Sequence, residues 1–107
     1  MIGEFEALRI DVVARSDELI VVVCGDIDVA TAPQLDGHLR KAEQWGRDVV
    51  VDLASVDFLD AAALRVLILS HRRLQATGRR LILRNVSGGP SRVLALSGFA
   101  ETFDLAG

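Results

Sequence analysis

Runs of aliphatic and β-branched residues alternate along the chain with segments of helical periodicity, and this alternation most narrows the possible folds. The run "LIVVVCG" is almost continuously apolar, which is typical of a strand buried on both faces of a sheet. "LRIDVVA" alternates and is followed by the polar turn "SDE", so it forms a hairpin with that strand. We predict four strands, at residues 8–14, 19–25, 48–53 and 79–86.

Three helices are predicted between and after these strands. Residues 31–45 open with the cap candidate Thr31 and stop before Gly46. The second helix, residues 60–77, starts at Asp60. After the turn signal "SGGP", the segment "SRVLALSGF" predicts a short third helix that starts at Pro90 or Ser91 and ends at Gly98. The apolar stripe of the second helix is Ala63, Leu64, Leu67, Ile68, His71 and Leu74.

The element order is therefore β-β-α-β-α-β-α. It predicts an α/β fold in which helices pack on a mixed sheet of four to five strands, with right-handed crossovers between the later strands. A chain of 107 residues with only four Phe and one Trp is expected to form a single domain over residues 1–107, with an aliphatic core.

Cellular location is indicated by three features of the sequence. No stretch reaches the roughly 18 apolar residues of a membrane span, and the N-terminus "MIGEFEALRI" has acids where a signal peptide has basic residues. The single cysteine, Cys24, excludes an internal disulfide and any multi-cysteine metal site. We expect a cytoplasmic protein with no membrane insertion.

Charge is distributed unevenly between the two halves of the chain. Residues 1–59 carry 5 basic and 12 acidic side chains, whereas residues 60–107 carry 7 basic and 3 acidic ones. Such a difference can steer a protein partner, although a surface of mixed sign is the commoner result. The arginines at 72, 73, 79 and 80 have no interleaved aromatic residues, so direct nucleic-acid binding is not expected.

Acidic side chains gather where two of the predicted strands give way to helices. Asp26 and Asp28 lie in "CGDIDVAT", and Asp57 and Asp60 lie in "LASVDFLDA". Because ligands of open α/β sheets bind beyond the carboxyl ends of the strands, these junctions form the candidate site.

The same junctions resemble a known family. "GDID" after a buried strand, "VVVDLASVDFLDAAAL" with an aspartate at a helix start, and the final "VLALSGFAETF" are similar to a STAS domain of the bacterial anti-sigma factor antagonist type. The resemblance covers about residues 8–105. In that family the helix start carries an aspartate followed by a serine that is phosphorylated. The aspartate corresponds to Asp60, and the serine corresponds to Ala61.

The resemblance implies a partner-switching function in the regulation of transcription and the stress response. The unphosphorylated domain of this family binds an anti-sigma factor of the serine kinase type and frees a sigma factor, and phosphorylation reverses this. Because the methyl group of Ala61 cannot accept phosphate, the chain is expected to stay competent to bind. The expected partner-binding residues are Asp26, Asp28, Asp57, Phe58, Asp60, Ala61, Ala62, Ala63 and Leu64. No cofactor or metal is implied, and a homodimer is left open.

Two alternatives remain. A STAS accessory subunit of a lipid or anion transporter, or of a stress-signalling complex, would also tolerate the missing serine. The run "VVVCGDIDVAT" approaches the aspartate-x-aspartate signature of small phosphatases, in which one aspartate attacks phosphate. The phosphatase pattern also needs a lysine after a strand. The only lysine here, Lys41, lies on a predicted helix, so the pattern is incomplete and we expect a protein that is not an enzyme.

Overall fold

The computed structural model describes residues 8–106, so the ends of the predicted 1–107 domain, residues 1–7 and 107, lie outside the described residues. Five strands form one sheet in the order β1-β2-β3-β4-β5. The elements along the chain are β1 (Arg9–Ala14), β2 (Glu18–Cys24), α1 (Ala32–Glu43), β3 (Asp48–Ser55), α2 (Ala61–Gln75), β4 (Leu81–Arg84), α3 (Gly88–Ser97) and β5 (Asp104–Ala106). The predicted α/β fold with a mixed sheet is confirmed.

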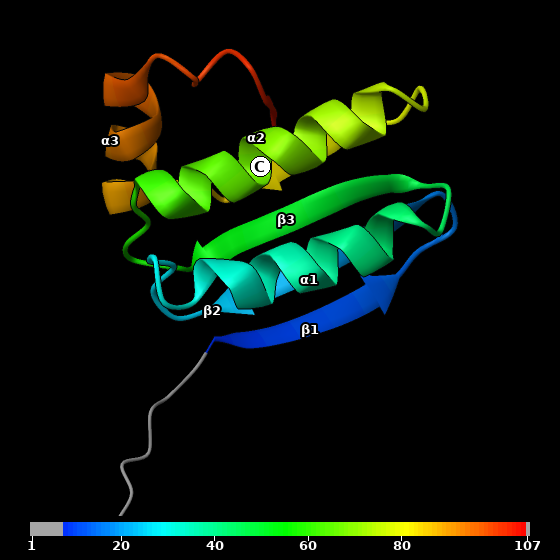
Figure 1. The fold of residues 1–107 in the computed structure, drawn as a ribbon, viewed down its shortest axis with the longest axis horizontal. Helices are drawn as coiled ribbons and strands as arrows, with labels where there is room; N and C mark the ends of the chain where they lie inside the picture. The colour runs from blue at the N-terminus through cyan, green and yellow to red at the C-terminus, as the bar shows by residue number, and fades with distance from the viewer. Residues whose placement is uncertain (1–7, 107) are drawn as a thin grey trace, which may run out of the picture.

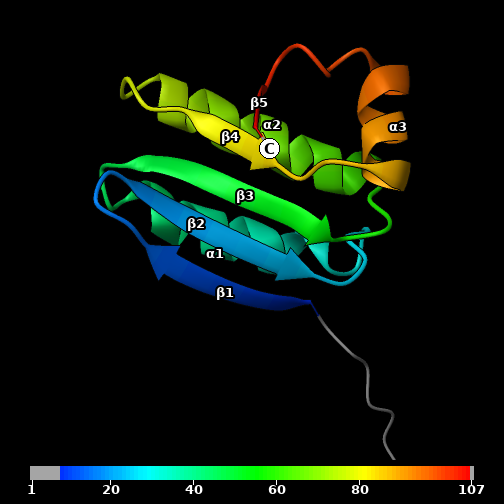
Figure 2. The same cartoon turned by 180° about the vertical axis from the view of Figure 1, so that it is seen from behind.

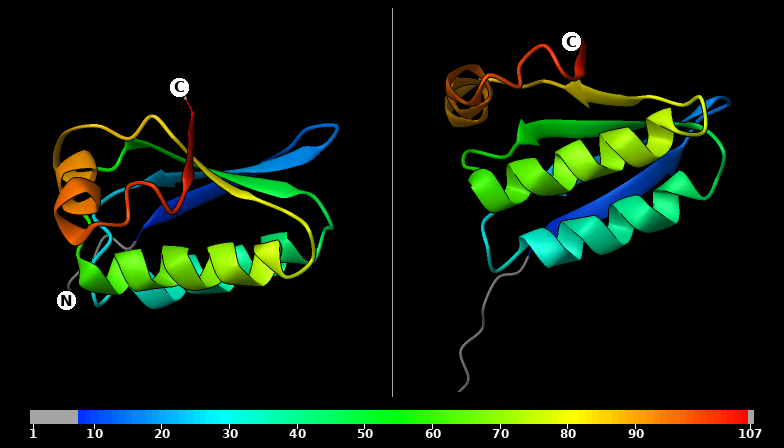
Figure 3. Two further views of the ribbon diagram at one scale, coloured as in Figure 1. Left: turned by 90° about the horizontal axis from the view of Figure 1, so that it is seen from above. Right: turned by 45° about the horizontal axis from the view of Figure 1, so that its top comes forward.

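The hairpin predicted at the N-terminal end is present, because β1 pairs antiparallel with β2. All other neighbouring strands are parallel, so β2, β3, β4 and β5 end at the same edge of the sheet. Figure 1 shows α1 and α2 side by side on one face, and Figure 3 shows α3 standing at the end of the sheet where β3 and β4 finish. The candidate site therefore lies at this end.

The main core fills the space between the sheet and the α1–α2 layer. Leucine and valine side chains from β2, β3 and β4 meet Leu35 and Leu39 of α1 and Leu67 and Leu74 of α2, all of them fully or almost fully buried. Burial of this kind contributes about 1.5–3 kcal/mol for each large aliphatic side chain. The aliphatic core predicted from the scarcity of aromatic residues is thus present.

Within the described residues 8–106, the opposite face of the sheet carries no helix (Figure 2). It has a smaller apolar cluster of Ile20, Val50 and Ile82. An ion pair of 3.6 Å joins Arg84 on β4 to Glu18 on β2 and so bridges across β3, the strand that holds the fully buried Val50. The aliphatic stems of such charged side chains can shield apolar surface that no helix covers.

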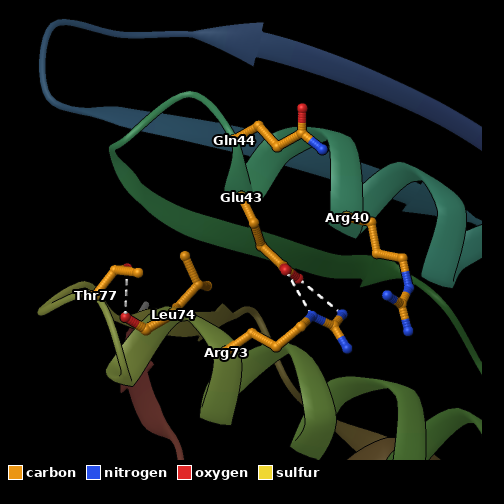
Figure 4. A pocket seen from close by; sticks show the side chains of 6 residues that line it. All are labelled: Arg40, Glu43, Gln44, Arg73, Leu74 and Thr77. Atoms are coloured by element: carbon orange, nitrogen blue, oxygen red, sulfur yellow. Dashed lines mark hydrogen bonds and ion pairs between the residues drawn. The ribbon is translucent and has the colours of Figure 1, made fainter.

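A partly buried polar cluster joins α1 to α2. The carboxylate of Glu43 accepts hydrogen bonds from Arg73 at 2.6 and 2.9 Å (Figure 4). It accepts another from the hydroxyl of Ser70, which is fully buried. These interactions raise the pKa of the Arg73 guanidinium, chiefly through its hydrogen bonds to Glu43. Every member of the cluster is paired, which is the condition under which buried polar groups are tolerated between helices.

Two features of the C-terminal part differ from the prediction. The third helix begins at Gly88, directly after Ser87, so the predicted turn "SGGP" forms most of its first turn. Pro90 is compatible with that turn because the first amides of a helix have no partner within the helix. The fifth strand, β5, was not located from the sequence, since its three residues are all exposed and show no alternation.

Candidate functional site

Two loops meet at the carboxyl ends of β2 and β3 and are held together through their backbones. The amide of Ile27 donates to the carbonyl of Phe58 at 3.0 Å, and the amide of Asp60 donates to the carbonyl of Ile27 at 3.2 Å. Ile27 and Leu59 form a parallel bridge, and both side chains are buried. The two acidic junctions predicted from the sequence therefore form one surface.

Asp60 caps the start of α2, as predicted. Its backbone is extended, and its Oδ1 accepts hydrogen bonds from the amides of Ala62 at 2.9 Å and Ala63 at 3.1 Å. These two amides would otherwise lack a partner at the helix start. Ala61, the first helical residue, is exposed and takes no part in the cap. A side chain at position 61 is therefore free to serve a purpose other than stability.

Asp28 and Thr31 order the loop before α1. Oδ1 of Asp28 accepts from the amides of Ala30 at 2.9 Å and Thr31 at 3.0 Å. The hydroxyl of Thr31 accepts from the Asp28 amide at 2.9 Å and donates to the Asp26 carbonyl at 2.9 Å. The Thr31 side chain was expected to cap α1, but it bonds backward into the loop and makes no cap bond.

These contacts also affect the charge of Asp28. The hydrogen bond from the Thr31 amide is the main cause that holds the pKa of this carboxyl group below its ordinary value. Hydrogen bonds to a carboxylate stabilise its charged form. Asp28 therefore stays ionised, and it adds negative charge to a surface that already includes the exposed Asp26 and Asp57.

The start of α3 closes the site from the third junction. A Cβ atom at Gly89 would lie 2.5 Å from the carbonyl oxygen of Asp57, far inside normal contact distance. Only glycine lets the α3 backbone approach the Asp57 loop this closely. The sequence contained a weak signal for this contact, the paired glycines in "SGGP", but a turn explained them equally well.

The predicted site residues separate into surface and core. Asp26, Asp57, Phe58 and Ala61 are exposed, with Phe58 47% exposed. Asp28, Asp60 and Ala62 are partly exposed beside them. Ala63 and Leu64 face the main core, with 0% and 6% exposure. Helical periodicity already placed these two residues on the apolar stripe of the helix, and they add little to the exposed surface.

One further residue of this surface was missed. Val29 is 74% exposed and lies between the partly exposed Asp28 and the exposed Ala30. With Ala62, Val66 and Leu69 it lines a groove of about 360 Å³ between α1 and α2. An apolar side chain in an otherwise polar loop is a signal that the sequence alone could have supplied.

Among residues 8–106, each helix is too short or too polar to cross a membrane. No group of three or more His, Cys, Asp or Glu side chains within this part of the chain is arranged to hold a metal ion.

Comparison with known proteins identifies the family. The model of the STAS domain matches residues 9–106. The anti-sigma-B factor antagonist of Bacillus subtilis is 26% identical over 92% of this chain and 91% of its own length, and that of Staphylococcus epidermidis is 30% identical over 88% of each chain. The crystal structure of an anti-sigma factor antagonist from Mycobacterium paratuberculosis has a TM-score of 0.81 and 27% identity, covering 94% of this chain and 86% of that one. The chain belongs to the STAS domain family, among relatives that are anti-sigma factor antagonists.

Proposed function

We propose that this protein is an anti-sigma factor antagonist that binds an anti-sigma factor of the serine kinase type and thereby frees a sigma factor. It acts by protein–protein interaction and not as an enzyme. Its family and the names of its relatives support the general function. The kinase type of the partner is part of the proposal and is implied by the resemblance to the family.

The docking region is the surface formed by the two joined loops and the start of α2, which we call the loop surface. Its residues are Asp26, Asp28, Val29, Asp57, Phe58, Asp60, Ala61 and Ala62. The carboxylates favour a partner that presents basic side chains, and the exposed ring of Phe58 offers apolar contact at the centre of such an interface. The small side chains at 61 and 62 allow a partner backbone to approach the helix start closely.

The observation that carries the proposal is the pairing of the Asp60 cap with an exposed Ala61. A hydroxyl at position 61 would be accessible to a kinase, and its phosphate would bring about −1.5 to −2 charges next to Asp60 and Asp28. A partner docked there would have to desolvate that charge, so phosphorylation would release it. The methyl group of Ala61 accepts no phosphate, and we infer an antagonist that stays competent to bind.

The first experiment mixes the purified protein with the kinase-type anti-sigma factors of its own organism. We expect a stable complex with at least one of them, both with and without ATP, and no phosphate on the chain by mass spectrometry. Phosphate on Ser55 or Thr31 would contradict the permanently competent state. If no such anti-sigma factor binds, the transporter accessory subunit becomes the better interpretation.

The second experiment restores the hydroxyl. Ala61→Ser should become phosphorylated in the presence of the bound kinase and ATP, and binding should then weaken at least about tenfold, because the phosphate must be desolvated at the interface. Ala62→Ser is the matched control, since its side chain lies one residue further and is only partly exposed. Equal phosphorylation of both variants, or of neither, would show that position 61 is not the regulatory position.

A further inference from the structure

The second half of the chain has an unusual excess of positive charge. Between Asp60 and Glu101 the sequence contains seven arginines and no acidic residue. Three of them reach carboxylates elsewhere in the fold, namely Arg73, Arg80 and Arg84. Within residues 8–106 the other four form no ion pair, and these are Arg65, Arg72, Arg79 and Arg92. Their charges are therefore available to a partner.

Two of these four arginines border one groove. Arg65 and Arg72 lie seven residues apart on α2, which places them on one side of the helix and roughly 10 Å apart along its axis. The groove has a volume of about 430 Å³ and lies between α2 and the segment that ends α3. Its apolar lining is Leu64, Ile68, Leu69 and Phe99, and Ala61 lies at its edge.

The groove on the other side of α2 differs in its charge. It is also apolar, but its second arginine, Arg40, is held by Asp36 at 2.9 Å in an ion pair within α1. Arg65 lines both grooves, whereas Arg72 lines only the one next to α3. Only the α2–α3 groove thus combines an apolar floor with two arginines that have no carboxylate partner in residues 8–106.

This combination specifies the chemistry of what binds there. Guanidinium groups two helical turns apart match carboxylates spaced two turns apart on one face of a helix, each able to form a bidentate pair. Apolar side chains between those carboxylates would pack on Ile68 and Leu69 in the manner of a helix in a groove. A segment without acidic residues would leave two arginines facing an apolar surface at the interface, which costs binding energy.

We propose that the α2–α3 groove binds an acidic amphipathic helix of the anti-sigma factor, next to the loop surface. This inference rests on the proposed function, because it names the same partner. The docking surface is then bipolar, with carboxylates around Asp26 and Asp57 and arginines along α2. A partner with the opposite arrangement can dock in one orientation only, since the reversed orientation brings like charges together.

The test is a double charge reversal, Arg65→Glu with Arg72→Glu, measured by calorimetry against an anti-sigma factor that binds the wild-type protein. We expect affinity to fall at least about tenfold, as is typical when like charges are placed opposite each other at an interface. The control with the same change in net charge is Arg79→Glu with Arg92→Glu, because both arginines are exposed, form no ion pair within residues 8–106 and do not line the groove. It should change affinity by less than about twofold.

A second variant tests the apolar floor. Ile68→Ser removes an apolar side chain that lines this groove and not the α1–α2 groove. The position is partly exposed, so the fold should survive, and thermal unfolding verifies this. The affinity of this variant for the anti-sigma factor should fall, as that of Arg65→Glu with Arg72→Glu does. If both variants bind the anti-sigma factor with the affinity of the wild-type protein, the proposed role of the groove is wrong, whereas the proposed function stands.

The remaining outcomes also decide the question. An equal loss from Arg79→Glu with Arg92→Glu would show that net charge and not the groove determines affinity, and would overturn the proposal. A wild-type dimer that the double reversal in the groove dissociates would assign the groove to a second copy of the chain instead. Failure of the wild-type protein to bind any kinase-type anti-sigma factor would reject the proposed function itself.

Discussion

The two helices that pack on the sheet begin in different ways, although each follows an aspartate. Before α1, the carboxylate of Asp28 and the hydroxyl of Thr31 are tied to each other and to the loop backbone by several hydrogen bonds. Before α2, Asp60 alone satisfies two amides, and the next side chain is a methyl group. The hydroxyl is thus part of the local structure at the first site and is dispensable at the second.

The comparison indicates which positions can vary without loss of fold. Thr31 lies partly buried within its hydrogen bonds, so its oxygen is not available for other chemistry. Ala61 is exposed and forms no bond that holds the loop. We therefore expect gain or loss of a hydroxyl at position 61 to leave the fold unchanged, whereas the same change at position 31 should alter the loop itself.

The largest effect is expected from a residue that supports only the second helix start. In Gly89→Ala the new Cβ would lie 2.5 Å from the carbonyl oxygen of Asp57, a backbone atom that cannot move aside as the end of a flexible side chain could. Overpacking of this kind costs about 1–3 kcal/mol of unfolding free energy, measurable by urea denaturation.

Gly37→Ala is the control for this variant. Gly37 lies within α1, and a Cβ there meets nothing within 4 Å. Alanine in place of glycine in a helix interior should stabilise the protein by about 0.5–1 kcal/mol. Loss of stability in both variants would show that the close approach at Gly89 is not the cause.

Removal of the Asp60 cap should have an intermediate effect. Asp60→Ala leaves the amides of Ala62 and Ala63 without an acceptor, at a cost of about 1 kcal/mol in unfolding free energy. Asp60→Asn keeps a side-chain oxygen and should stay within a few tenths of the wild-type value. If the asparagine variant lost as much stability as the alanine variant, the charge of Asp60, and not its capping oxygen, would be what stabilises α2.

Much of the fold could be predicted because its signals are local. The apolar runs identified the four longer strands, and a capping aspartate with helical periodicity located α2 to within two residues at each end. Two tertiary features were not predictable. β5 has three exposed residues with no pattern of their own, and α3 begins early because Gly89 fits against a loop distant in sequence.

The site was predicted to the same degree. The rule for parallel strands correctly brought together the two acidic junctions, residues 26–28 and 57–60, since it depends only on element order. It could not separate Ala61, which is exposed, from Ala63 and Leu64, which are buried. Which of these residues is exposed depends on its position around the axis of the helix. The arginines of the α2–α3 groove were visible as a charge excess, but which of them lack partners depends on contacts between distant elements.

The smallest effect should come from the charge at the first helix start. Because the folded protein holds the pKa of Asp28 below its ordinary value, the unfolded chain binds the proton more readily, and acidification favours unfolding. This contribution is fully present at neutral pH and is lost as the pH falls below about 4 and through the lowered pKa. Asp28→Asn should therefore be less stable than wild type at pH 7, with a difference that shrinks in acid.

Asp26→Asn is the control, because Asp26 joins the same loop through its main-chain oxygen. A difference for Asp28→Asn that persists unchanged in acid would show that the amide geometry, and not the charge, is what the asparagine disturbs.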